Sequence, residues 1–251
     1  MASDAAPALL EAEGRVALVS GAAGGIGRAT VGLFRAAGAS VVAFDSDAAR
    51  LPARGDKLLP VAGDATREED VRGAVRAAVA SFGRLDFAIG AVGVTGRGAL
   101  AETSLEEWRR LMDINLTSAF LLARESHQAL VRPGGVLVLI ASVHSRNGGG
   151  RLSGAPYAIA KSGIANLVRH LAKDWAAEDV RVNCVMPGPV ATPMLDRLSA
   201  EEHEALRDTI PLKRYAQAGE IAAAIAYLCS KHAVSMTGAC MNVSGGLVLD
   251  Q

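Results

Sequence analysis

Two side chains that could transfer a proton lie four residues apart in segment 157–161. On a helix, this spacing places Tyr157 and Lys161 on one face. A lysine ammonium about 4 Å from a phenol, at an effective dielectric of about 20, stabilises the phenolate by about 4 kcal/mol. That energy is enough to bring an ordinary tyrosine pKa of about 10 down to about 7. The pair therefore suits acid–base chemistry, although the same spacing also occurs on ordinary surface helices.

A glycine-rich turn near the N-terminus follows the apolar run 16–19 and opens a helical pattern. Its spacing is G-x-x-x-G-x-G, in which Gly21 permits a tight turn and Gly25 allows close approach of a pyrophosphate. Gly27 allows the helix to pack on its strand, with the N-terminal amides facing the anion. An ordinary tight turn is the alternative, but a second apolar run ends at Asp45, where a ribose-binding acid is expected.

Together these motifs resemble the single-domain short-chain dehydrogenase/reductase family of the Tyr-x-x-x-Lys type. The resemblance extends from about Gly14 to Gly246, and several motifs follow the order typical of the family. It implies an oxidoreductase that transfers a hydride between a nicotinamide cofactor and a secondary alcohol or ketone. It also implies a homotetramer.

The resemblance implies four catalytic residues. Tyr157 would exchange a proton with the substrate oxygen, Lys161 would also bind the nicotinamide ribose, and Ser142 would hydrogen-bond the reacting oxygen. Asn115 would hold a proton-relaying water; an amide on a helix surface is the alternative. Ser142 lies fifteen residues before Tyr157, further than is usual in the family. A lengthened loop is therefore expected, with Ser145 as the fallback.

Asp45 is the residue expected to select the cofactor, because a carboxylate accepts hydrogen bonds from a ribose 2′-hydroxyl and repels a 2′-phosphate. Gly24 and Ser46 stand where a basic residue could serve NADP, which also favours NAD, while Arg28 is a counter-indication. A solvated acid at a strand end is the alternative for Asp45. The cofactor-binding residues implied by the resemblance are Gly21, Gly25, Ile26, Gly27, Asp45, Asp64, Ala65, Ala91, Gly93, Tyr157, Lys161, Pro187, Gly188, Val190 and Thr192.

Three of these cofactor segments also have a simpler structural interpretation. Asp64 and Ala65 resemble the family turn that contacts adenine, but they also suit a helix-entry turn. Segment 89–93 replaces the family's Asn-Asn-Ala-Gly and lacks both asparagines, so backbone approach survives while local rigidity is in doubt. Segment 187–193, with three prolines, resembles the loop that meets the nicotinamide or is a plain rigid connector.

Strand-like and helical patterns alternate along the whole chain. This alternation predicts an α/β fold, a single doubly wound (Rossmann) domain with about seven parallel strands and helices on both faces. A ligand should lie beyond the carboxyl ends of the strands, where the strand order reverses. Helix starts are expected at capping boxes in 66–69 and 104–107. The strand candidates are 16–20, 40–44, 57–61, 85–89, 135–140, 180–185 and 239–243.

Two loops, about 143–156 and 190–214, are expected to shape the substrate pocket. In the first, His144 or Arg146 is hypothesised to meet a polar or acidic substrate group; a solvated loop is the alternative. The second could form an apolar lid or a packed amphipathic helix. Its apolar residues are Met194, Leu195, Leu198 and Leu206.

The resemblance implies a small-molecule alcohol or carbonyl compound as the partner, and the composition argues against two other classes of partner. The 251 residues carry 26 basic and 26 acidic side chains, which argues against nucleic acid or an anionic membrane as the main partner. No apolar run approaches the ~20 residues that span a bilayer. Residues 1–13 read as a flexible leader and 14–251 as the catalytic domain, with a cytoplasmic location. Three scattered cysteines without a CxxC pair argue against a metal site or a disulfide framework.

Two other functions stay open from the sequence. An NADPH-dependent 3-oxoacyl-carrier-protein reductase shares the fold and the catalytic residues, and Asp45 and Gly24 argue against it. A non-catalytic dinucleotide-binding protein would have no need of Tyr157.

Overall fold

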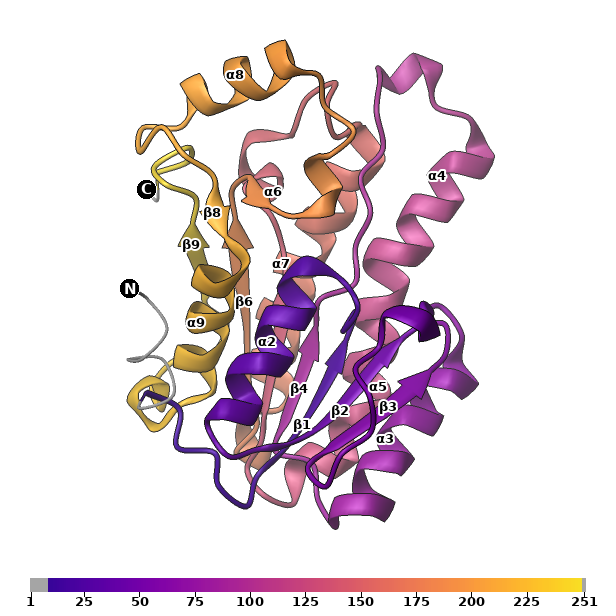
Figure 1. Ribbon diagram of the computed structural model, residues 1–251, viewed down its shortest axis with the longest axis vertical. Helices are drawn as coiled ribbons and strands as arrows, with labels where there is room; N and C mark the ends of the chain where they lie inside the picture. The colour runs from indigo at the N-terminus through magenta and orange to yellow at the C-terminus, as the bar shows by residue number, and fades with distance from the viewer. Residues whose placement is uncertain (1–8, 250–251) are drawn as a thin grey trace.

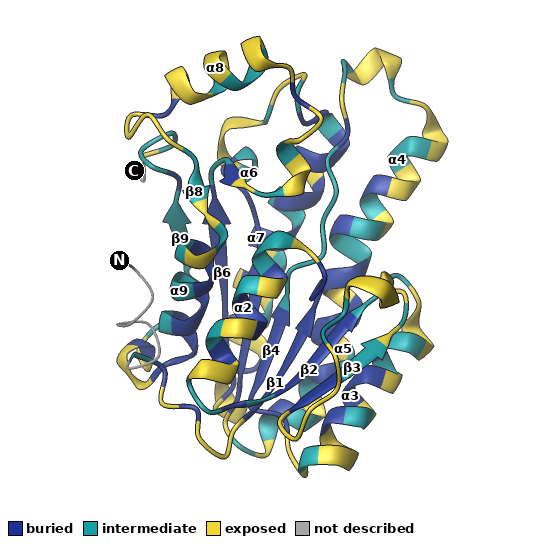
Figure 2. Ribbon diagram, in the orientation of Figure 1, coloured by how far each residue is buried: buried dark blue, intermediate teal, exposed yellow. Residues whose placement is uncertain are grey.

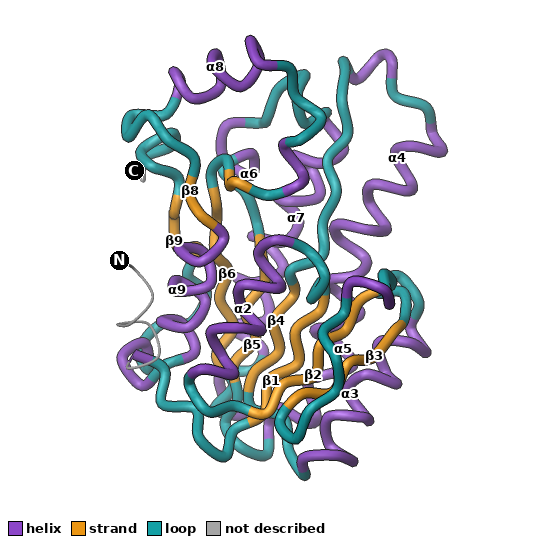
Figure 3. The backbone as a smooth tube through the Cα atoms, viewed as in Figure 1, coloured by secondary structure: helices purple, strands orange, loops and turns teal. Residues whose placement is uncertain are grey.

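A parallel sheet of seven strands forms the centre of the computed structural model, which describes residues 9–249 (Figure 3). The strand order is β3-β2-β1-β4-β5-β6-β9, so the order reverses between β1 and β4. All seven predicted strands are confirmed within two residues. A small sheet of β7 (Val190–Ala191) and β8 (Ala216–Gln217) was not predicted. The main strands are β1 (Val16–Ser20), β2 (Ser40–Asp45), β3 (Leu58–Ala62), β4 (Phe87–Gly90), β5 (Val136–Ile140), β6 (Arg181–Pro187) and β9 (Cys240–Val243).

Helices cover both faces of the sheet, as the alternating pattern predicts (Figure 1). On one face lie α2 (Gly25–Ala36) and α9 (Ala218–Cys229), and on the other lie α3 (Glu68–Phe82), α5 (Ser118–Val131) and α7 (Ala155–Asp174). The remaining α-helices are α4 (Leu105–Met112), α6 (His144–Asn147) and α8 (Ala200–Thr209). Short 3₁₀ turns occupy Ala48–Arg50, Leu100–Glu102, Ala176–Glu178, Pro193–Leu195 and Lys231–Ala233. A π-helical turn, Asp113–Thr117, joins α4 to α5.

Two apolar cores lie on opposite faces of the sheet, because successive strand side chains point to opposite sides. Val16 and Leu18 of β1 belong to the core under α3, α5 and α7, while Ala17 and Val19 belong to the core under α2 and α9. Burial on both faces explains why the strands are continuous apolar runs rather than alternating ones. Figure 2 shows the inner strands dark among more exposed helix faces, while the edge strand β9 is intermediate.

The segment before β1 packs on the domain in its described part. Leu10 and Ala12 are buried in the core with α2, and the Ala12 amide donates to the Ala37 carbonyl at 3.2 Å. The Glu11 carboxylate pairs with Lys231 at 2.6 Å. Residues 9–13 are therefore held against the body rather than loose, and the rest of the expected leader, 1–8, lies outside the described residues.

The two predicted helix starts differ in outcome. Ser104 caps α4, and its hydroxyl accepts from the Glu107 amide at 3.1 Å. Helix α3 begins later than expected, at Glu68, because Thr66 is held by the carboxylate of Asp64. Asp64 thus engages the threonine expected to cap the helix, and Arg67 stands at the N-cap without a side-chain bond.

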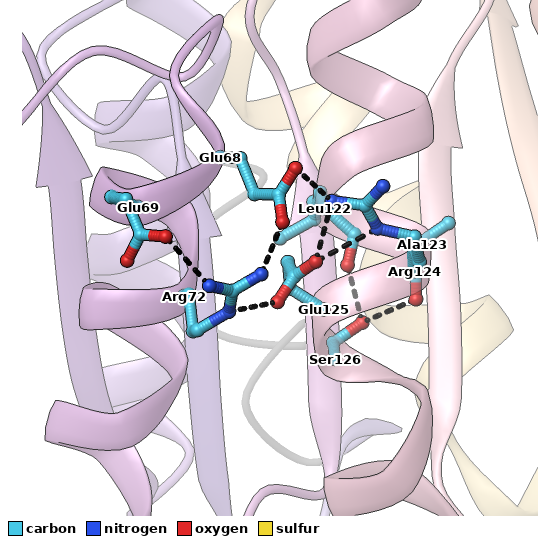
Figure 4. Close-up of polar contacts among 8 residues, drawn as sticks. All are labelled: Glu68, Glu69, Arg72, Leu122, Ala123, Arg124, Glu125 and Ser126. Carbon is cyan, nitrogen blue, oxygen red and sulfur yellow. Dashed lines mark hydrogen bonds and ion pairs between the residues drawn. The ribbon is translucent and has the colours of Figure 1, made fainter.

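A cluster of ion pairs joins α3 to α5 (Figure 4). Arg72 of α3 donates to Glu125 of α5 at 2.9 Å and also pairs with Glu68 and Glu69. Arg124 of α5 reaches back to Glu68 at 2.7 Å and pairs with Glu125 at 2.8 Å. Burial alone would raise the pKa of Glu125, but the hydrogen bonds from Arg72 and Arg124 outweigh it and lower that pKa.

No helix within residues 9–249 is both long enough and apolar enough to cross a membrane.

Candidate functional site

Two adjoining cavities form a groove at the carboxyl edge of the sheet, where the strand order reverses. Their common wall is the segment after β4, which includes Ala91 and Gly93. The first cavity, about 540 Å³, is lined by Gly21, Asp45, Asp64 and Ala65. The second, about 820 Å³, is lined by Gly25, Ile26, Ser142, Tyr157, Lys161, Pro187, Gly188, Val190 and Thr192. The fold thus brings nearly all the expected site residues together, and only Gly27 and Asn115 lie outside the lining.

Close backbone approach explains the glycines of the first turn. Gly21 has a φ of +81°, and a Cβ there would lie 2.7 Å from the backbone of Ala91. A Cβ on Gly27 would lie 2.0 Å from the Gly21 carbonyl oxygen, so Gly27 serves helix packing as expected. A Cβ on Gly25 would meet the Thr192 side chain at 2.4 Å. The glycine turn and the proline loop therefore lie so close together that a side chain at position 25 would clash with Thr192.

The carboxylate of Asp45 is fixed on the wall of the first cavity. One oxygen accepts from the Ala23 amide at 2.9 Å, which ties the strand end to the glycine turn. The other accepts from the Asp47 amide at 3.0 Å. A carboxylate oxygen has two lone pairs, so each oxygen keeps one for a hydroxyl in the cavity.

Asp64 and Ala65 line the same end of the groove as Asp45. The Asp64 carboxylate accepts from both the amide and the hydroxyl of Thr66 at 2.8 Å. These bonds hold the turn in place without a ligand. Its position on the cavity wall is compatible with an adenine-contacting turn and with a simple helix-entry turn.

Tyr157 and Lys161 lie on one face of α7, as their spacing predicts, and both are buried at 8% and 2% exposure. The Lys161 ammonium donates to the Ile140 carbonyl at 2.8 Å and lies 5.7 Å from the centre of the Tyr157 ring. Burial lowers the pKa of Lys161 to about 8. The pair thus sits at the floor of the second cavity, where water has little access.

The electrostatics of Tyr157 differ from the sequence expectation. Burial raises the pKa of the phenol above its ordinary value, and the groups that oppose this rise are the Ser142 hydroxyl and the Arg197 guanidinium. The Lys161 ammonium is directed to the Ile140 carbonyl, and burial lowers its own pKa to about 8. Desolvation of the phenolate therefore outweighs the Coulomb term on which the sequence argument relied.

Ser142, and not Ser145, lines the cavity beside Tyr157. Ser142 follows β5 directly, and its Oγ accepts from the His144 amide at 3.2 Å. The Ser145 hydroxyl donates to the Ser142 carbonyl at 2.6 Å and lies 3.3 Å from the sulfur of Met186. Ser145 therefore supports the turn that presents Ser142.

The lengthened loop after Ser142 folds as the short helix α6 followed by glycines in left-handed conformations. His144 lines the cavity, and its ring packs edge-on against Tyr157 with 6.0 Å between ring centres. Burial lowers the pKa of His144, which keeps the imidazole neutral near pH 7. Arg146 is not among the lining residues. Of the two hypothesised contacts, His144 alone is in position, and as a neutral group.

Asn115 lies in the π-helical turn between α4 and α5 and is fully buried. Its side-chain amide donates to the carbonyls of Leu111 and Val94, both at 2.9 Å, and its oxygen accepts from the Val94 amide at 3.2 Å. These hydrogen bonds fix the loop after β4. They make this loop rigid although segment 89–93 lacks the two asparagines of the family motif. The π turn, a feature often found at functional sites, was not predicted from the sequence.

The apolar residues of segment 190–214 that were expected to form a lid or an amphipathic helix all line the second cavity, namely Met194, Leu195, Leu198 and Leu206. Figure 1 shows α8 at the end of the sheet toward which the strands point. Sequence reasoning missed Arg197, a single cation among these apolar lid residues. Its guanidinium donates to the carbonyls of Met194 and Gly96, both at 3.3 Å, and to that of Leu152.

No group of three or more His, Cys, Asp or Glu side chains that could hold a metal ion occurs within the described part of the chain.

Known proteins similar to this chain fall into one group of enzymes. A family model described as enoyl-(acyl carrier protein) reductase matches residues 21–248. An uncharacterized short-chain type dehydrogenase/reductase of Sinorhizobium fredii is 38% identical over 93% of this chain, which spans only 43% of that longer protein. A cis-4-hydroxycyclohexanecarboxylate dehydrogenase of Sinomonas cyclohexanicum is 36% identical over 92% of this chain and 96% of its own. A solved 3-ketoacyl-(acyl-carrier-protein) reductase from Brucella melitensis, complexed with NADH, has a TM-score of 0.88 and 30% identity, covering 94% of this chain and 99% of that one.

Proposed function

This chain belongs to the short-chain dehydrogenase/reductase family, and we propose that it is an NAD(H)-dependent oxidoreductase that interconverts a secondary alcohol and its ketone. The observation that carries the proposal is one continuous groove. It has a fixed carboxylate, Asp45, at one end and Ser142, Tyr157 and Lys161 together at the other.

The dinucleotide would lie along this groove. Asp45 would accept hydrogen bonds from the adenosine ribose, and the backbone of the glycine turn would face the pyrophosphate. Asp64 and Ala65 would flank the adenine, and Lys161 would bind the second ribose. The loop from Pro187 through Gly188 and Val190 to Thr192 would hold the nicotinamide, which takes up or supplies the hydride when bound. The solved Brucella melitensis neighbour complexed with NADH supports this class of cofactor.

Tyr157 would give its proton to the substrate oxygen in reduction and take it back in oxidation, while Ser142 hydrogen-bonds that oxygen. The buried ammonium of Lys161 stabilises negative charge that develops on the phenol during the transfer. Asn115 holds the loop after β4 in place, and a water beside it would pass protons to solvent.

The preference for NAD over NADP rests on Asp45. A 2′-phosphate there would lose the ribose hydrogen bonds and meet a carboxylate held by the Ala23 and Asp47 amides. Losing a hydrogen bond to a charged group costs about 1.5–3 kcal/mol, so a preference of at least about tenfold is expected.

A 3-oxoacyl-carrier-protein reductase is the second candidate, and the solved neighbour of that name supports it. The curated relative that acts on a hydroxycyclohexanecarboxylate supports the secondary-alcohol assignment. The cytoplasmic location and the homotetramer implied by the family resemblance complete the proposal, and sedimentation analysis tests the assembly.

The deciding experiment is steady-state dehydrogenation of secondary alcohols, hydroxy acids, polyols and steroids, with NAD and NADP in parallel. Turnover with NAD, and a narrower NAD preference in Asp45→Ser, supports the proposal. Turnover with NADP alone overturns the cofactor assignment and favours the acyl-chain reductase. Tight NADH binding without turnover of any compound favours a non-catalytic dinucleotide-binding protein.

A further inference from the structure

The described lining of the second cavity contains basic, apolar and neutral polar residues but no aspartate or glutamate. Its cations are Arg50, Arg151, Lys161 and Arg197. Arg50 has an ion-pair partner in Asp47 at 3.8 Å, and Arg151 has one in Glu102 at 3.3 Å. Lys161 donates to the Ile140 carbonyl beneath Tyr157. Arg197 is left as a cation at the cavity roof.

Arg197 has no carboxylate within ion-pairing distance among residues 9–249. Its three described hydrogen bonds go to main-chain carbonyls of the lid, the loop after β4 and the loop after α6. Glu202, whose charge acts on Arg197, is itself paired with Arg97. A guanidinium has five N–H donors, so two remain for a ligand.

The position of Arg197 relates it to the reacting end of the cavity. Its charge acts on the Tyr157 phenol, so the two groups face the same space. Between them the wall is apolar and includes Leu152, Met194 and Leu198. A substrate with an apolar body and an anionic end opposite its hydroxyl would complement this arrangement.

We propose that Arg197 binds a carboxylate of the substrate, so that the enzyme acts on an apolar hydroxy acid and the corresponding oxo acid. The hydroxyl carbon would lie at Tyr157 and the carboxylate at the lid. Arg197 is exposed, and a planar guanidinium with two unused donors beside an apolar wall matches a carboxylate better than it matches any neutral group. This inference deepens the proposed function and rests on it for the identity of the reacting end.

A purely structural role for Arg197 is the competing explanation, because its three carbonyl bonds join three segments of the roof. The two roles differ in what they predict. If Arg197 is structural, its replacement should weaken the binding of every ligand of the cavity alike. If it binds a carboxylate, its replacement should weaken the binding of anionic ligands and leave that of neutral ligands of the same shape unchanged.

Calorimetric titration separates the two roles without requiring turnover. Cyclohexanecarboxylate and its isosteric carboxamide are titrated into the enzyme with and without NADH, and hexanoate with hexanamide forms a second pair. The carboxylates are expected to bind at least about tenfold more tightly, the equivalent of one charge-assisted hydrogen bond. In Arg197→Met this advantage should fall to within about twofold while carboxamide affinity is retained.

Arg151→Met is the matched control, because it removes another arginine of the same cavity, one that is already paired with Glu102. It should retain the carboxylate preference. Equal wild-type affinity for acid and amide, no binding of either, or a parallel loss of both in Arg197→Met overturns the inference.

Arg197→Lys covers the case in which Arg197→Met does not fold. Lysine keeps the positive charge but cannot form the paired hydrogen bonds of a guanidinium, so an intermediate preference for the carboxylate is expected. If both the preference and the affinity for the two ligands are unchanged, the result counts against carboxylate recognition by the guanidinium. Because none of these titrations needs catalysis, a failure here is distinct from failure of the proposed function, which falls if no alcohol reduces NAD.

Discussion

Tyr157 is placed where burial opposes the ionisation that its chemistry requires. Because burial raises the phenol pKa, the side chain is protonated at neutral pH, which suits the proton donation proposed for ketone reduction. Alcohol oxidation needs the phenolate, whose charge Ser142 and Arg197 favour. Its surroundings therefore favour the protonated phenol, which can act as an acid. The phenolate, which acts as a base, depends on stabilisation by neighbouring charge and hydrogen bonds.

Replacing Tyr157 with Phe should remove turnover and spare the fold and the cofactor. The ring still fills the same space on α7, while the proton donor is lost, so kcat should fall by about 10²–10⁴. NADH affinity, measured by fluorescence titration, should change by less than about threefold. A loss of NADH binding together with turnover would instead make Tyr157 a structural residue.

Replacing Lys161 with Met should make the protein more stable at neutral pH while removing activity. The folded-state pKa of Lys161, about 8, lies below its usual value of 10.5, so folding disfavours the charged amine and the cost of burying the ammonium is fully present below about pH 8. That cost is roughly 3 kcal/mol, and losing the bond to the Ile140 carbonyl offsets about 1–3 kcal/mol of the gain. The Tm at pH 7 should therefore rise by about 2–4 °C.

The pH series provides the control for Lys161→Met. Wild-type stability relative to the variant should increase as the pH rises from 8 toward 10.5, because the neutral amine carries no burial penalty. An advantage of the variant that does not change over this range would show that the buried charge is not its cause.

At the scale of elements, the ion-pair cluster between α3 and α5 should contribute measurably to stability. Glu125 is only 11% exposed and accepts from both Arg72 and Arg124. Glu125→Gln keeps the shape and removes the charge, so the free energy of unfolding should fall by about 1 kcal/mol and the Tm by about 2–4 °C. Thermal unfolding followed by circular dichroism measures the change.

The acid side of the pH profile tests the origin of that contribution. The folded-state pKa of Glu125 is lowered, so its stabilisation is present above the usual carboxyl pKa and is lost as the pH falls through the folded value. Wild type and Glu125→Gln should differ near pH 7 and converge in acid. A difference that persists in acid would assign the effect to packing.

The elements that the sequence predicts and those that it misses differ in what determines them. All seven central strands, the doubly wound topology and the glycine turn follow from local apolar runs and glycines. The β7–β8 pair and the π turn at Asn115 depend on contacts between distant segments, such as Val190 with Ala216 and Asn115 with Val94. The sequence also could not predict that Arg197 lowers the Tyr157 pKa, because only the folded chain brings residue 197 close to the phenol.

At the scale of the whole molecule, the groove extends over both halves of the sheet, which meet where the strand order reverses between β1 and β4. Asp45 follows β2 on one side, and Ser142 follows β5 on the other. One extended ligand that contacts both ends binds only the native arrangement, so it stabilises the fold by mass action. Cofactor binding and global stability are therefore linked in this fold.

NADH should raise the Tm more than NADPH does. At a concentration 100 times its Kd, a ligand that binds only the native state adds about 2.7 kcal/mol, which corresponds to about 5–10 °C for a chain of this size. NADPH at the same concentration should give a much smaller shift, because its 2′-phosphate meets the Asp45 carboxylate. In Asp45→Ser the two shifts should approach each other, since the repelling charge is gone while the glycine turn is kept. Equal shifts in the wild type would show that Asp45 does not discriminate between the cofactors, and a larger shift with NADPH would move the cofactor assignment to NADP.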